Sequence, residues 1–363
     1  MRLPLPPRPV RRVVLAPAVI GATTVLLAVT PIVVIVLLFS VRFLPGRWRA
    51  LRLVWFAVVY LVRESVGLIA LAVLWVLSGF GWKLGSERFQ LAHVALMGWF
   101  LRGLVQMAGR VLGLVLSTEG VPELDADRGG EATPVLVFSR HAGAGDSLIL
   151  VHLLVNLYHR RPHIVLKELL QLDPCIDVVL NRLPNRFIGP HGSSDVVDSI
   201  RSLATELERD GALILFPEGG NFTEARRRRA IERLAESGLH ESVARAEELT
   251  YVLPPRPGGA LAAIDAAPDA DVLFVAHTGL EQLSSLADLW RGLPMDREVR
   301  ITWWTVRRQE VPDDPAERIT WLYEWWEVID TWIEQHHATD RPAAPMVAVH
   351  DDVEQCTDGP GAR

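Results

Sequence analysis

The segment Ser139-Arg140-His141-Ala142-Gly143-Ala144-Gly145-Asp146 marks the point where a predicted strand passes into a predicted helix. The residues before it, 134–139, form a short apolar run typical of a buried strand. The residues after it, 148–158, continue as an apolar helical pattern. A strand followed directly by a helix is the repeating unit of an α/β fold, so polar residues in this turn lie where such folds bind ligands.

His141 and Asp146 are the chemically active residues of this turn. Gly143 and Gly145 allow the chain to fold back, which brings the Asp146 carboxylate to an imidazole nitrogen of His141. That contact would fix the histidine tautomer and leave the other nitrogen as a general base near neutral pH. Asp146 would also make a good N-cap for the helix without any catalytic role, so the pair alone leaves both interpretations open.

A second strand-to-helix turn follows at residues 216–223. The apolar run 212–216 predicts a strand, Pro217 ends it, and Glu218-Gly219-Gly220-Asn221 leads into a segment of helix formers that begins near Thr223. Consecutive glycines before a helix expose backbone N–H groups, which suit a phosphate or a developing oxyanion. Alone, this segment is also consistent with an ordinary turn.

Together, the His-x4-Asp motif and the Phe-Pro-Glu-Gly motif, 75 residues apart, resemble the glycerolipid acyltransferase family, whose best known members are the lysophosphatidic acid acyltransferases. The resemblance extends roughly over residues 119–337. It implies that His141 is the general base, that Asp146 orients it, and that residues 218–221 bind an oxyanion or a phosphate. The implied reaction moves an acyl group from acyl-CoA or acyl carrier protein to a hydroxyl of a lysophospholipid, directly and without a metal or bound cofactor.

Two further segments carry the resemblance and also depart from it. Lys167-Glu168-Leu169-Leu170 with Phe187-Ile188-Gly189-Pro190 is similar to the family's second motif. Residues 251–259 are similar to its proline-containing fourth motif. The segments 218–223 and 252–256 are most similar to the branch that reacylates lysocardiolipin and lysophosphatidylinositol.

The family usually has arginines, associated with the acceptor's phosphate, where this chain has Pro190 and Asn221. Their loss leaves the acceptor open. A glycolipid or another hydroxylated lipid is an alternative acceptor, and a non-catalytic lipid-binding relative is an alternative function.

Other cations are candidates to replace the missing arginines. Arg226, Arg229 and Arg233 share one face of the helix after Glu218, and Arg256 lies in a stiff proline-rich loop. Lys167 is one of only two lysines. A solvated charged face is the default interpretation of the helical arginines. A net charge of -6 argues against a nucleic-acid partner.

The N-terminal part predicts attachment to a membrane. A basic segment, 1–12, precedes the uncharged apolar stretch 13–41, which is longer than a signal peptide's apolar core and long enough to cross a bilayer. A second apolar stretch, 53–82, contains Arg63 and Glu64, so a second span is better placed from residue 65 to 82. We expect a membrane-embedded hairpin over 13–82, with one or two spans or inserted into one leaflet.

Basic residues between the two stretches match the N-terminal cluster in number, so they do not orient the hairpin. We expect an integral or tightly attached protein of the cell membrane that contacts the lipid bilayer, with its catalytic domain on the cytoplasmic side.

The following segment, 83–118, predicts a helix with a narrow polar stripe of Arg102, Gln106 and Arg110. An interfacial helix, a buried helix of the catalytic domain and a third span are all consistent with it. The acyltransferase domain would cover 119–337 and the tail 338–363 is expected to be disordered. Within the domain, strands are predicted at 134–139, 163–166, 186–188, 212–216, 272–277 and 299–306.

The alternation of these strands with helical patterns predicts an α/β domain with a mostly parallel sheet flanked by helices, preceded by the N-terminal membrane helical hairpin. Cys175 and Cys356 have neither disulfide nor metal-site spacing. The hydrophobic fraction of 50% and mean hydropathy of +0.22 are high for a wholly soluble protein and agree with the membrane segment.

Overall fold

The computed structural model describes residues 5–40, 48–120, 132–143, 145–189, 193–281, 290, 293 and 297–337. In this part of the chain a seven-stranded sheet has the order β1-β7-β6-β2-β5-β3-β4. Neighbouring strands are parallel except for the antiparallel pair β6 and β7. The strands are β1 (Leu114–Glu119), β2 (Val135–Ser139), β3 (Arg161–Lys167), β4 (Arg186–Ile188), β5 (Gly211–Leu215), β6 (Asp271–Thr278) and β7 (Arg297–Val306).

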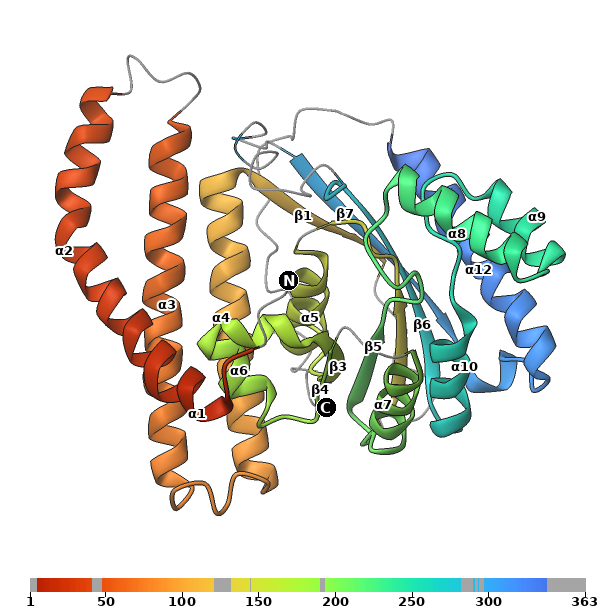
Figure 1. Ribbon diagram of the computed structural model, residues 1–363, viewed down its shortest axis with the longest axis horizontal. Helices are drawn as coiled ribbons and strands as arrows, with labels where there is room; N and C mark the ends of the chain where they lie inside the picture. Colours follow the sequence, from red (N-terminus) through yellow and green to blue (C-terminus); the bar gives the residue numbers. More distant parts are fainter. Residues whose placement is uncertain are drawn as a thin grey trace, which may run out of the picture.

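Helices cover both faces of this sheet (Figure 1). One face packs against α3 (Arg49–Leu77), α4 (Glu87–Met107), α5 (Asp146–Asn156) and α6 (Pro174–Leu180), and the other against α7 (Ser193–Thr205), α10 (Pro257–Ala266) and α12 (Pro315–His337). The pair α8 (Glu224–Glu236) and α9 (His240–Glu248) lies to one side (Figure 1). Short 3-10 helical turns lie at Glu168–Leu172 and Arg308–Glu310.

Strand β2 explains why the sequence has continuous apolar runs here. Val135 and Val137 face the core that includes α5, whereas Leu136 and Phe138 face the core that includes α10. All four side chains are almost fully buried. A strand buried on both faces has no position for an outward polar residue, so the α/β prediction with a mostly parallel sheet is confirmed.

The N-terminal segment forms α1 (Arg8–Val10), a π-helical turn (Arg11–Leu15) and α2 (Ala16–Ser40), which lies beside α3 (Figure 1). Arg8–Phe39, Arg49–Leu77 and Glu87–Leu112 are long and apolar enough to cross a membrane. The predicted helical pair is therefore present.

The helix that contains the second apolar stretch differs in its bounds from the predicted span at 65–82, because α3 is continuous from residue 49 to 77. The charged pair does not interrupt it, since each charge meets a different element. Glu64 accepts the backbone N–H of Cys175 at 2.8 Å, and the Arg63 guanidinium lies over the Trp99 ring, 4.0 Å from its centroid.

The prediction of one helix over 83–118 also needs correction. Helix α4 and the π-helical turn Ala108–Leu112 end at Gly113, whose φ of 73° is left-handed. The chain then enters β1, an edge strand that pairs in parallel with β7. The partner strand lies far away in sequence, so no local pattern could distinguish this strand from an extension of the helix. Helix α4 packs against both α3 and α5 (Figure 1).

Most of the C-terminal tryptophans belong to the core. Phe274 of β6 stacks on Trp325 with centroids 4.6 Å apart and makes edge contacts with Trp321 and Trp326. Cys175 is buried and unpaired. The predicted tail 338–363, with Cys356, lies outside the described residues, as does Pro190.

Candidate active site

The sheet order brings several candidate residues together at one edge of the sheet. Strand β2 lies between β5 and β6, and β5 also pairs with β3. His141 follows β2, Glu218 follows β5, and Lys167 ends β3. These strands are parallel, so their carboxyl ends meet at the same edge.

The His141 imidazole donates from Nδ1 to Asp146 Oδ2 at 2.7 Å. The same carboxylate oxygen accepts the backbone N–H groups of Ala142 and Gly143 at 3.0 and 3.3 Å. Gly145 has a φ of 99°, which returns the chain toward the histidine, and it takes the N-cap position. Asp146 is the first helical residue rather than the N-cap, and its carboxylate is directed back at the turn.

Three more contacts hold His141 in place. Its N–H donates to Glu218 Oε1 at 3.1 Å, and its carbonyl accepts the Phe222 N–H at 2.8 Å. The Phe216 ring lies beside the imidazole with centroids 4.5 Å apart. The His141 side chain is 20% exposed. With Nδ1 bound to the carboxylate, the remaining nitrogen, Nε2, has its lone pair available.

The electrostatics of this pair favour an ionised aspartate. Burial raises the pKa of Asp146, but the hydrogen bond from His141 and the charges of His277 and His141 outweigh it and hold the pKa below its usual value. An ionised Asp146 stabilises the imidazolium that forms when His141 takes a proton.

Glu218 has a different environment from the one predicted for it. Its carboxylate is buried and accepts two backbone N–H groups, that of His141 and, at 3.2 Å, that of Leu253. Burial raises its pKa to about 8, although the Arg140 charge opposes this. By accepting these two N–H groups, the Glu218 carboxyl group joins the segments on either side.

Arg140 and His277 contribute to the site but were not predicted. The buried Arg140 guanidinium donates to the carbonyls of His277 and Tyr251 at 2.7 and 3.0 Å and to Glu281 at 2.6 Å. His277 Nε2 lies 3.1 Å from the Arg140 carbonyl and 3.9 Å from Asp146 Oδ2. Both residues lie at the carboxyl ends of strands, β2 and β6, that the sequence predicts. This position was the feature of the sequence that could have indicated them as site residues.

A backbone hydrogen bond closes the Gly219-Gly220 turn, and two arginine side chains lie against it. The Gly219 N–H donates to the Phe216 carbonyl at 2.9 Å, so it is already used. Within the described residues no acceptor is found for the Gly220 N–H. Gly219 has a φ of 69°, and a Cβ there would lie 3.0 Å from the Arg256 guanidinium. A Cβ on Gly220 would lie 3.5 Å from Arg226.

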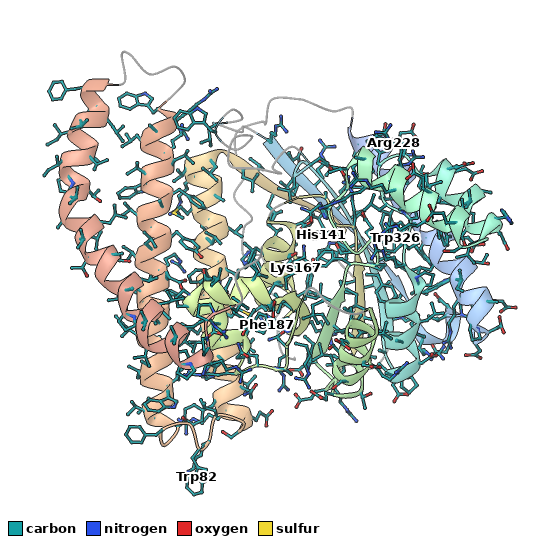
Figure 2. All side chains as sticks on the ribbon, viewed as in Figure 1. Trp82, His141, Lys167, Phe187, Arg228 and Trp326 are labelled. Carbon is teal, nitrogen blue, oxygen red and sulfur yellow. The ribbon has the colours of Figure 1, made fainter. Side chains whose placement is uncertain are left out.

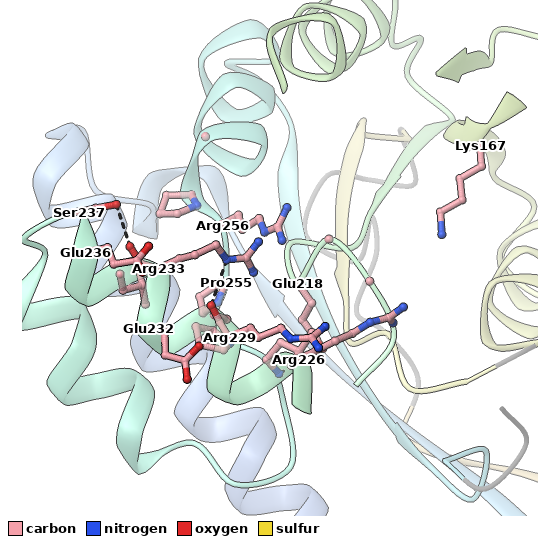
Figure 3. A pocket seen from close by; sticks show the side chains of 18 residues that line it. Lys167, Glu218, Arg226, Arg229, Glu232, Arg233, Glu236, Ser237, Pro255 and Arg256 are labelled. Carbon is pink, nitrogen blue, oxygen red and sulfur yellow. Dashed lines mark hydrogen bonds between the residues drawn. The ribbon is translucent and has the colours of Figure 1, made fainter. Parts of the chain in front are cut away.

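A cavity of about 750 Å³ opens beside this turn (Figure 3). The structure brings the predicted phosphate-binding cations Lys167, Arg226, Arg229 and Arg256 into its lining. Arg233 and the turn residues 218–220 line it as well, but Asn221 and His141 do not. The Asn221 carbonyl instead accepts Arg226 Nη1 at 2.8 Å. The segment 218–222 therefore contributes to the cavity lining and also contacts the His141 backbone.

The cations of the cavity are not neutralised by partners. In the part of the chain that the structure describes, neither Lys167 nor any of the four arginines forms an ion pair. Partial burial first, and the Arg233 charge second, lower the pKa of Arg256. Such a cluster of unneutralised cations favours an anionic ligand.

Residues 118–278 match the family model described as Acyltransferase. The matched segment runs from the end of β1 to the end of β6 and includes His141, Asp146, Glu218 and the arginines of the cavity. It supports acyltransferase activity in general. A search of curated proteins finds no match to the chain.

Proposed function

We propose that the protein is a membrane-bound O-acyltransferase that moves a fatty acyl group from an acyl thioester to a hydroxyl of a lysophospholipid. The observation that carries this proposal is the 2.7 Å contact between His141 Nδ1 and Asp146. It leaves Nε2 as a base, and the three contacts around His141 hold that base in one orientation.

In the proposed reaction, His141 Nε2 takes the proton from the acceptor hydroxyl as its oxygen attacks the thioester carbonyl carbon. The resulting tetrahedral oxyanion collapses by breaking the carbon–sulfur bond. The thiolate leaves and takes the proton back from the imidazolium, so an ester and a free thiol are formed. The Gly220 N–H is the candidate oxyanion donor of the glycine turn, because the Gly219 N–H is already used.

The acceptor's phosphate is the proposed ligand of the cations nearest the glycine turn. Arg226 and Arg256 reach Gly220 and Gly219, respectively, which supports a phosphate bound against this turn. They would take the place of the arginines usual in the family's motifs. A guanidinium binds phosphate through two parallel hydrogen bonds, so this replacement preserves the chemistry while changing the positions that supply it.

The donor is proposed to be acyl-CoA or acyl-loaded acyl carrier protein, with no metal and no bound cofactor. Apolar surface near the site supports a lipid substrate. Leu169, Leu170 and Leu172, which follow Lys167 directly, are between 43% and 63% exposed. Adjacent exposed leucines are unusual on a water-facing surface and suit contact with acyl chains or lipid.

The membrane would contact α2 and the outer face of α3, both rich in exposed apolar side chains. The catalytic domain contacts α3 from Arg49, which donates to the Leu293 carbonyl, to Leu71, whose carbonyl accepts from Arg182. That separation is about 33 Å, similar to the thickness of the hydrocarbon core. Because the catalytic domain contacts α3 over this whole length, α3 cannot be surrounded by lipid as a helix that crosses the bilayer would be. We therefore propose that α3 inserts into one leaflet beside the domain.

Trp82, which is 86% exposed and projects from the turn between α3 and α4 (Figure 2), suits the membrane interface. In this arrangement the catalytic domain stays on the cytoplasmic side with its active site near the headgroups.

The test is transfer of label from acyl-CoA to a panel of lysophospholipids by purified protein, with the His141→Ala variant as the comparison. A product that the wild type forms and the variant does not would support the proposal. Transfer only to glycolipid acceptors would favour a glycolipid acyltransferase. Inactivity with both donors and every acceptor would favour a non-catalytic lipid-binding protein.

A further inference from the structure

We infer that the cavity beside α8 binds a group carrying at least two phosphates. Arg226, Arg229 and Arg233 form a row on the side of α8 that lines the cavity, and Arg256 lies across from them (Figure 3). The row spans seven residue steps of helix, about 10 Å. One phosphate typically accepts hydrogen bonds at about 2.8 Å from one or two guanidinium groups, so the four arginines of the cavity exceed what one phosphate needs.

The charge of the cavity points to the same conclusion. Four arginines and Lys167 line it, against two solvent-facing carboxylates of α8, Glu232 and Glu236, and the buried Glu218. Neither Glu232 nor Glu236 forms an ion pair within the described residues. With Glu218 neutral, these cations exceed the carboxylates by three charges. One phosphate compensates about two of them, so a second phosphate is needed for the remainder.

The volume of the cavity also exceeds what one phosphate needs. About 750 Å³ lies within the range of sites that bind whole small molecules rather than single ions. The two ends of the row differ in surroundings. Arg226 lies against Gly220, whereas Arg233 lies farther along α8, beside the Ser237 end (Figure 3). One phosphate would therefore lie at the glycine turn and the other toward Arg233.

Two substrates of the proposed reaction could supply such a group, and this step rests on the proposed function. One is the nucleotide part of coenzyme A, which carries several phosphates at the end remote from the thioester. The other is a lipid acceptor whose headgroup bears a second phosphate. Both present the same chemistry to the arginine row.

The experiment measures ligand binding to the purified full-length protein in detergent, with no acyl transfer involved. The probes are adenosine bisphosphate, inositol bisphosphate and glycerol phosphate. We expect at least one bisphosphate to bind roughly tenfold or more tightly than glycerol phosphate. Arg229→Gln and Arg233→Gln should each weaken that binding roughly tenfold, because each removes a charge-assisted contact.

Arg228→Gln is the matched control, since it removes the same charge from the same helix but lies outside the cavity lining (Figure 2). Its effect should stay within roughly twofold, as expected for a screened surface charge. Selective binding of adenosine bisphosphate assigns the cavity to the donor, and selective binding of inositol bisphosphate assigns it to the acceptor.

Equal binding of glycerol phosphate, absence of binding by every probe, or an equal loss in Arg228→Gln would overturn the inference. His141→Ala separates it from the proposed function, because that variant should still bind the bisphosphate. Bisphosphate binding by a protein that acylates no acceptor would refute the proposed function and leave this inference standing.

Discussion

The Asp146 carboxylate binds the His141 imidazole and the two backbone N–H groups that follow His141 through one oxygen, Oδ2. Its other oxygen accepts the Ser147 N–H at 2.6 Å. The aspartate therefore orients the His141 imidazole and shapes the turn that carries it.

Asp146→Asn should lower kcat by roughly 10²- to 10⁴-fold, because an amide can neither enforce the Nδ1–H tautomer nor stabilise the imidazolium. KM should change much less. The measurement is steady-state acyl transfer, with circular dichroism to verify the fold. Ser147→Ala is the control, since it removes only the 3.2 Å hydroxyl contact to the same carboxylate and should stay near wild type. An Asn variant with near-normal turnover would refute a catalytic role for Asp146.

Glu218→Gln should destabilise the protein by roughly 1 to 3 kcal/mol. The amide keeps one acceptor oxygen but places an NH2 group against the N–H of either His141 or Leu253, which leaves a buried donor unsatisfied. Chemical denaturation in detergent measures the loss of stability. Activity should fall as well, because His141 loses one of the contacts that hold it in place. Unchanged stability would show that the two backbone contacts are dispensable.

The raised pKa of Glu218, about 8 against an ordinary 4.5, also predicts a pH effect. Between these values the folded protein binds a proton that the unfolded chain releases, so stability should fall as the pH rises through this window. Thermal denaturation at about pH 5, 7 and 9 should show a smaller decline for Glu218→Gln than for wild type. Parallel curves for the two proteins would contradict the shift.

Gly219→Ala and Gly220→Ala form a matched pair. Alanine at 219 must adopt a left-handed φ and meet the Arg256 guanidinium at 3.0 Å, so we expect a cost of about 1 to 2 kcal/mol and weaker anion binding. At 220 the new Cβ would make ordinary contact with Arg226 at 3.5 Å, and stability should change little. Chemical denaturation measures the stability of each variant. An equal loss of stability in both would contradict the observed geometry of the turn.

Asp177→Asn should loosen the N-terminal segment from helix α6. Asp177 is buried and pairs with Arg11 at 2.7 Å and Arg12 at 3.2 Å. Removing its charge leaves the buried Arg11 with hydrogen-bond acceptors but without a carboxylate partner. Breaking such a buried ion pair typically costs about 3 to 5 kcal/mol. Limited trypsin digestion should then cleave after Arg11 or Arg12 faster than in wild type. Arg8→Gln, which loses an exposed hydrogen bond to Asn181, is the control and should digest normally.

The local sequence determined much of the fold and the contact between His141 and Asp146. The six predicted strands are present because short apolar runs buried on both faces have a distinctive pattern, as Val135 to Phe138 illustrate. The contact between His141 and Asp146 was predictable because both residues lie in one short turn whose glycines let it close.

Only the tertiary structure decided the rest. Strand β1 depends on pairing with β7, far away in sequence, and the buried position of Glu218 depends on backbone N–H groups from His141 and Leu253. The role of the arginines was likewise open, because a charged helix face has the same periodicity whether it meets water or a cavity. It lines a cavity here because Arg256 and the Gly219-Gly220 turn lie opposite α8. Such contacts between distant segments form only when the sheet is assembled, so local patterns cannot reveal them.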